Sequence, residues 1–147
     1  MPPMKSFVKQ YGIFLAWIQA IVATGGSLYM SEVLNWTPCI LCWYQRIFMY
    51  PLVILILVGI YIKDKLLPYY VLALSIPGAL IAIYHYLLQK GILPEEVAPC
   101  TLGASCETEY IGWFGFITIP LMSFAAFAII SLITYLYFKY SQEDNLD

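Results

Sequence analysis

Charged residues divide this sequence into long apolar stretches, and that pattern is the first feature that predicts structure. No charge occurs between Lys9 and Glu32, so residues 10–31 form an uncharged stretch of 22 residues. Because a helix of roughly 20 apolar residues crosses a bilayer, we expect a first membrane-spanning helix over about residues 11–31. A cleaved signal peptide is the competing interpretation, but its apolar region would be only about 7–15 residues long.

Further apolar stretches predict more spanning helices, over about residues 39–62, 66–88 and 113–138. The second stretch contains a single charge, Arg46, and the third contains the lone histidine, His85. The connection between these two stretches, residues 63–65, is short. We therefore expect an all-α fold in which a single domain, residues 1–147, forms an integral membrane four-helix bundle.

The overall composition supports this class and argues against others. The chain is 62% hydrophobic and only 11% charged, and its mean hydropathy of +0.79 lies outside the range of soluble globular domains. Its net charge of −2 and its lack of a basic run give no indication of nucleic-acid binding. We expect membrane lipid around the bundle and no nucleic-acid partner.

The lysines predict how the bundle is oriented. They gather at the N-terminus, at the connection between the second and third spans and in the C-terminal tail, as Lys5, Lys9, Lys63, Lys65 and Lys139. The other two connections hold only Lys90 and several glutamates. The positive-inside rule then places both termini in the cytoplasm, and a short cysteine-bearing loop between helices three and four outside.

The four cysteines form two close pairs, Cys39/Cys42 and Cys100/Cys106, on the predicted outer side. The residues alone leave disulfides and a four-ligand metal site open. The oxidising side of a membrane favours disulfides, and five residues between Cys100 and Cys106 is an unusual spacing for zinc. We assign no metal, and a purely structural cross-link of the loop remains an alternative for Cys100/Cys106.

Cys39 and Cys42 stand at the beginning of the second predicted helix. Thr37 suits the N-cap and Pro38 the first helical position, so both thiols should lie in the first turn, where free N–H groups favour a thiolate. Arg46 falls on the same helix face. A bridge between residues three apart constrains little of the unfolded chain, so stabilisation explains this pair poorly. The arrangement indicates redox chemistry.

Arg46 and His85 are candidates for a binding site beneath the thiols. A charge inside a span is expensive and by default marks function, although an arginine can also extend to the interface. His85 lies about four residues inside the outer end of its span, where a histidine is often simply hydrogen-bonded. Because the two residues can lie at comparable depth, we predict a pocket for a membrane-soluble electron acceptor.

The candidate residues belong to four motifs: Pro38-Cys39-Ile40-Leu41-Cys42 with Gln45-Arg46, Tyr84-His85-Tyr86-Leu87-Leu88-Gln89, Pro99-Cys100, and Trp113-Phe114-Gly115 through Pro120. Together these motifs resemble the disulfide-bond formation protein B (DsbB) family, most closely its short BdbC-type branch. The resemblance implies a multi-pass protein of the bacterial cytoplasmic membrane whose active site faces outside. It also implies a thiol oxidase that reoxidises a thioredoxin-like extracytoplasmic partner (DsbA/BdbD-like) and passes the electrons to a quinone, menaquinone or ubiquinone.

The resemblance further implies a role for each candidate residue. The partner's thiolate would attack Cys100, Cys106 would then attack Cys39, and Cys42 would be left as the thiolate beside the quinone, with Arg46 and His85 binding the quinone. Two alternatives remain. One is a thiol/quinone enzyme similar to the vitamin K epoxide reductase family, and the other is a non-catalytic membrane subunit with structural disulfides.

Overall fold

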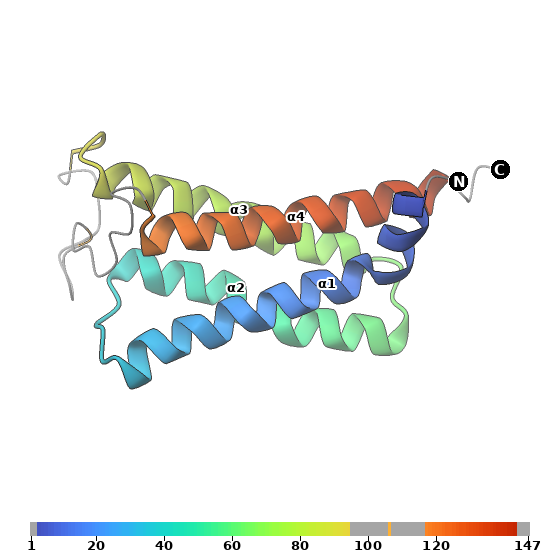
Figure 1. Cartoon of the computed structure of the whole chain (residues 1–147), viewed down its shortest axis with the longest axis horizontal. Coiled ribbons are helices and arrows are strands. Elements are labelled where there is room, and N and C mark those ends of the chain that lie inside the picture. The colour runs from blue at the N-terminus through green and yellow to red at the C-terminus, as the bar shows by residue number, and fades with distance from the viewer. Residues whose placement is uncertain (1–2, 95–105, 107–116, 144–147) are drawn as a thin grey trace.

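Four long helices make up the part of the chain that the computed structural model describes, residues 3–94, 106 and 117–143 (Figure 1). They are α1 (Pro3–Leu28), α2 (Ile40–Ile62), α3 (Leu67–Gln89) and α4 (Ile119–Glu143), and a π-helical turn, η1 (Tyr29–Val33), continues α1. Each of the four is long and apolar enough to cross a membrane. The predicted all-α, four-helix membrane fold is confirmed.

Successive helices run in opposite directions and pack side by side (Figure 1). α4 returns to pack against α1 as well as α3, whereas α2 and α4 lie diagonally opposite and contact each other little. Lys5 Nζ lies 3.2 Å from Glu143 Oε2, which joins the beginning of α1 to the end of α4. The α1–α2 connection lies at the other end of the bundle (Figure 1). Which end faces the cytoplasm stays a prediction.

Large apolar side chains fill the centre of the bundle. Phe127, Leu52 and Ile56 are fully buried there. A Cβ placed on Gly78 would overlap the Phe127 ring, so α3 and α4 approach closely because this position has no side chain.

The outer surface of the bundle is also apolar. Each helix exposes bulky aliphatic side chains, for example Val22 at 62%, Ile54 at 66%, Leu80 at 63% and Leu132 at 59%. Soluble monomers rarely expose apolar patches of this extent. Lipid chains are the surroundings that such a surface fits.

Candidate active site

The first turn of α2 begins later than the sequence predicts. Cys39, with extended backbone angles, is the N-cap, and its Sγ accepts a hydrogen bond from the Cys42 amide at 3.4 Å. The prediction that Thr37 caps the helix and Pro38 begins it is therefore wrong. The sulfur of Cys39 satisfies an amide that a threonine hydroxyl would otherwise bind. Both cysteines nevertheless lie at the helix N-terminus, as expected.

Cys39 and Cys42 are free thiols whose Sγ atoms lie 3.2 Å apart. Cys39 precedes the membrane-spanning segment and is 5% exposed. Hydrogen bonding from the Cys42 thiol is the main influence that lowers the pKa of Cys39 below its usual range; His85 acts in the same direction, and burial opposes both. Cys39 is thus suited to be a thiolate at neutral pH.

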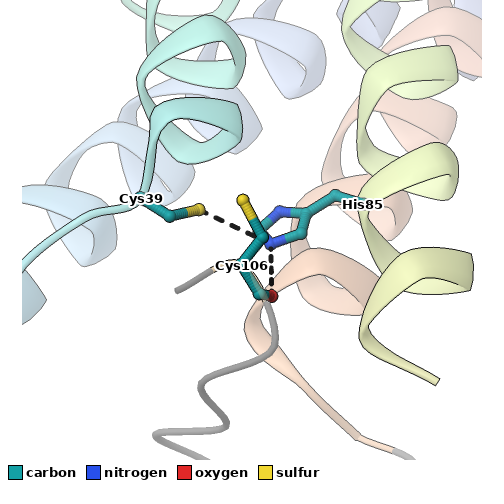
Figure 2. Close-up of side chains that lie close together, drawn as sticks. All are labelled: Cys39, His85 and Cys106. Atoms are coloured by element: carbon teal, nitrogen blue, oxygen red, sulfur yellow. Dashed lines mark hydrogen bonds between the residues drawn. The ribbon is translucent and has the colours of Figure 1, made fainter. Parts of the chain in front are cut away.

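His85 joins this thiol to the loop cysteine (Figure 2). Its ring is 3% exposed, and its Nε2 lies 3.5 Å from Cys39 Sγ and 3.3 Å from the Cys106 carbonyl oxygen. Because a carbonyl only accepts, we assign the proton to Nε2. Nδ1 then accepts from the amide of Gln45, whose Nε2 lies 3.1 Å away.

Cys106, the member of the second pair that the structure describes, lies against the first pair. It is 1% exposed and disulfide-bonded, while Cys100 lies outside the described residues. The Sγ atoms of Cys39 and Cys106 and a ring nitrogen of His85 all lie within 4.8 Å of one another. A free thiol of one pair therefore faces a disulfide sulfur of the other, which is the arrangement that thiol–disulfide exchange requires.

Arg46 is bound to the end of α1. Its Nη2 donates to the Ser27 carbonyl at 3.1 Å, and its guanidinium carbon lies 5.4 Å from the centre of the Trp43 ring. Tyr50 donates to the Ser27 hydroxyl at 3.4 Å. Ser27 lies at the point where α1 passes into the π-helical turn η1. This contact fixes the guanidinium between α1 and α2.

A cavity of about 320 Å³ lies next to these groups. Polar side chains line part of it, among them Cys39, Cys42, Gln45, Arg46 and His85. Apolar side chains from α1, α2 and α4 line the rest, including Val22, Ala23, Met49, Met122 and Ala126. The fold thus gathers at one cavity every site residue predicted from the sequence that lies in the described part of the chain.

Two residues near the cavity were not predicted as site residues. The sequence indicates Gln45 only as part of a motif, although an amide one turn beyond Cys42 in an apolar span is a usable signal. Ser27 acts through its backbone carbonyl, and no sequence pattern identifies which carbonyl an arginine will bind.

Comparison with known proteins decides the family. Residues 9–137 match the family model "Disulfide bond formation protein DsbB". The chain belongs to the DsbB family. The DsbB-family relatives include "Disulfide bond formation protein C" of Bacillus subtilis, 46% identical over 80% of this chain and 86% of that protein. "Probable disulfide formation protein C 1" of Bacillus anthracis is 40% identical over 89% of this chain and 94% of that protein. No solved structure matches.

Membership of the DsbB family, together with four helices able to span a membrane, makes this chain a multi-pass membrane protein and a disulfide oxidoreductase. A purely structural role for all four cysteines, one of the alternatives above, does not agree with this class. The electron acceptor, the protein partner and the residue roles are the subject of the proposal below.

Proposed function

We propose that this chain is a membrane thiol:quinone oxidoreductase that reoxidises a thioredoxin-like extracytoplasmic thiol oxidase and transfers the electrons to a membrane quinone. The observation that carries the proposal is that a sulfur of each cysteine pair, Cys39 and Cys106, lies close to the other beside a cavity. Cys39 Sγ and Cys106 Sγ lie within 4.8 Å of each other, and Cys39 and Cys42 both line the cavity.

In the route we propose, the reduced partner enters at the loop pair. A partner thiolate attacks Cys100 of a Cys100–Cys106 disulfide and releases the Cys106 thiolate, and the second partner thiol then displaces Cys100 and leaves the partner oxidised. Cys106 attacks Cys39 of an oxidised Cys39–Cys42 pair and releases the Cys42 thiolate. Cys100 next attacks Cys106 and releases Cys39, so the loop disulfide is restored and the helix pair is reduced.

The cavity has the size and the lining that a quinone requires. Its volume of about 320 Å³ is within the usual range of small-molecule sites, about 300–1,000 Å³. Arg46 offers N–H donors to a carbonyl oxygen, and the apolar side chains of α1 and α4 suit an isoprenoid tail. The reduced Cys39/Cys42 pair would give a bound quinone two electrons and two protons and would itself become a disulfide. His85, protonated on Nε2 and next to Cys39, is placed to stabilise the Cys39 thiolate.

Several further assignments belong to the same proposal. The partner is a DsbA/BdbD-like protein, the quinone is menaquinone or ubiquinone, and the membrane is the bacterial cytoplasmic membrane with the cysteines facing outside. Catalytic roles go to Cys39, Cys42, Cys100 and Cys106, and quinone binding goes to Arg46 and His85. The distribution of lysines supports this orientation.

A single-turnover experiment without a partner tests the proposal. The purified chain is reduced, freed of reductant under anaerobic conditions and mixed with menaquinone or ubiquinone, and both quinol and remaining thiols are counted. We expect one quinol for every two thiols lost. A chain that keeps its thiols and forms no quinol with either compound would exclude a quinone as the acceptor.

A further inference from the structure

The cluster around Cys39 offers a second kind of chemistry when all its sulfurs are reduced. Cys39, Cys42 and Cys106 would then supply three thiols around the imidazole of His85. We propose that the fully reduced protein binds one Zn²⁺ ion through Cys39, Cys42, Cys106 and His85. The proposed site exists only in the reduced protein, because sulfurs in a disulfide are not thiolate ligands.

Two of the distances around Cys39 already approach those of a tetrahedral zinc site. Zinc–sulfur bonds of about 2.3 Å and zinc–nitrogen bonds of about 2.0–2.1 Å place neighbouring ligand atoms roughly 3.5–3.8 Å apart. Here Cys39 Sγ lies 3.2 Å from Cys42 Sγ and 3.5 Å from His85 Nε2. Cys106 Sγ lies within 4.8 Å of the Cys39 and His85 ligand atoms. Cys42 Sγ does not lie within that distance of all three of these atoms, so closure requires both Cys42 and Cys106 to move toward the ion.

The ligand types and their surroundings also favour zinc. Cys39-Ile40-Leu41-Cys42 has the two-residue spacing of many zinc sites, and three thiolates with one imidazole are a common structural set. Gln45 would hydrogen-bond to Nδ1 of His85, the ring nitrogen that does not bind the metal. When Nε2 binds the metal, Nδ1 carries the proton, and rotation of the Gln45 amide turns its oxygen toward that proton. All three sulfurs bind as thiolates, and Arg46 offsets part of the resulting negative charge.

The site would hold the enzyme in its reduced state, a consequence that rests on the proposed function. When the partner remains reduced and no oxidised quinone is present, both cysteine pairs become dithiols and the ion can bind. Zinc would then occupy both the thiols that reduce the quinone and the thiol that attacks Cys39. Quinone reduction by the zinc-loaded protein would therefore be slower than by the metal-free protein.

Cobalt spectroscopy on the full chain tests the site without using quinone. The purified protein is reduced, freed of reductant anaerobically and titrated with Co²⁺, and Zn²⁺ is then added to displace the cobalt. We expect one Co²⁺ per chain, the strong visible bands of a tetrahedral ion and a sulfur-to-cobalt charge-transfer band. Protein whose cysteine pairs have been oxidised should show none of these signals.

Matched variants of the loop cysteines identify the ligands. Cys106→Ser should lower the charge-transfer intensity by about a third, because two thiolates remain of three, whereas Cys100→Ser should leave the spectrum unchanged. Gln45→Met should weaken Co²⁺ binding by about 10- to 100-fold, the usual effect of removing an outer-shell partner.

Two results would overturn the proposed site. One is the absence of a tetrahedral cobalt spectrum in the reduced chain. The other is loss of intensity in Cys100→Ser with an unchanged spectrum in His85→Ala, which would indicate the four-cysteine site that the sequence left open. Neither result depends on quinone, so a protein that binds cobalt but forms no quinol would contradict the proposed function alone.

Discussion

The guanidinium of Arg46 is held by a directed hydrogen bond to the Ser27 carbonyl at 3.1 Å. An arginine that only extended to the headgroups would be replaced by lysine with little loss. An arginine that binds a quinone carbonyl is different, because lysine has no planar fork of donors.

We predict that Arg46→Lys raises the apparent KM for quinone by at least about tenfold. Losing a hydrogen bond to a charged group costs about 1.5–3 kcal/mol, or roughly 10- to 150-fold in affinity. Steady-state quinone reduction at varied quinone concentration measures the effect, and disulfide exchange with the partner should persist in the same variant. An unchanged apparent KM for quinone would indicate that Arg46 only extends to the membrane interface.

The thiol of Cys39 provides a prediction about pH. Because its pKa is lowered, chiefly by the hydrogen bond from Cys42, Cys39 in the reduced protein should remain a thiolate at pH values where an ordinary cysteine, with a pKa of about 8.5, is protonated. Its alkylation by iodoacetamide should therefore persist into acidic solution. Cys42→Ala should shift the midpoint of alkylation to higher pH, as followed by mass spectrometry of the Cys39 peptide. Equal midpoints in the two proteins would contradict the assigned cause.

Single residues were predictable where their type was unusual for their surroundings. Arg46 and His85 stand out in apolar spans, and the cysteine pairs stand out by their spacing. Gln45 and the Ser27 carbonyl acquire their roles only from contacts between helices. Gln45 and His85 are 40 positions apart in sequence, and Arg46 and Ser27 are 19 positions apart. Local sequence does not encode such partners.

At the scale of elements, the existence of the four helices was predictable and the beginning of α2 was not. Hydrophobic length alone predicts a spanning helix. The cap depends on which side chain reaches the free amides, and the Cys39 sulfur does so in place of the Thr37 hydroxyl. The preference for threonine at the N-cap and proline at the first helical position is an average over many helices, and it does not decide the cap of a single helix.

Two adjacent glycines of α1, Gly25 and Gly26, allow a test of whether the quinone occupies the cavity. A Cβ on Gly25 or Gly26 meets no atom within 4 Å, and only Gly26 lines the cavity. Gly26→Leu should therefore fold, since leucine favours a helix over glycine, but should obstruct the cavity.

We expect Gly26→Leu to raise the apparent KM for quinone by about 5- to 150-fold, because overpacking typically costs about 1–3 kcal/mol. Gly25→Leu is the matched control and should behave like the unmodified protein. If both variants reduce quinone normally, the ligand does not occupy this cavity.

At the scale of the whole molecule, the orientation remains a prediction from the lysines. An impermeant thiol reagent applied to intact cells after mild reduction should label the loop pair, Cys100 or Cys106. In a chain that lacks its own cysteines, Lys65→Cys in the connection between α2 and α3 should be labelled only after lysis. The reverse pattern of labelling would show that the protein has the opposite orientation in the membrane.

The most direct test of the complete account follows electrons from a protein dithiol to quinone. The purified chain in liposomes is supplied with a reduced thioredoxin-like oxidase and quinone, and partner disulfide and quinol are measured together. We predict one quinol per partner disulfide, and in Cys106→Ser, whose loop has no disulfide for the partner thiolate to attack, neither partner disulfide nor quinol. Quinol formation at the normal rate after replacement of both Cys100 and Cys106, or partner oxidation without quinol, would contradict the account.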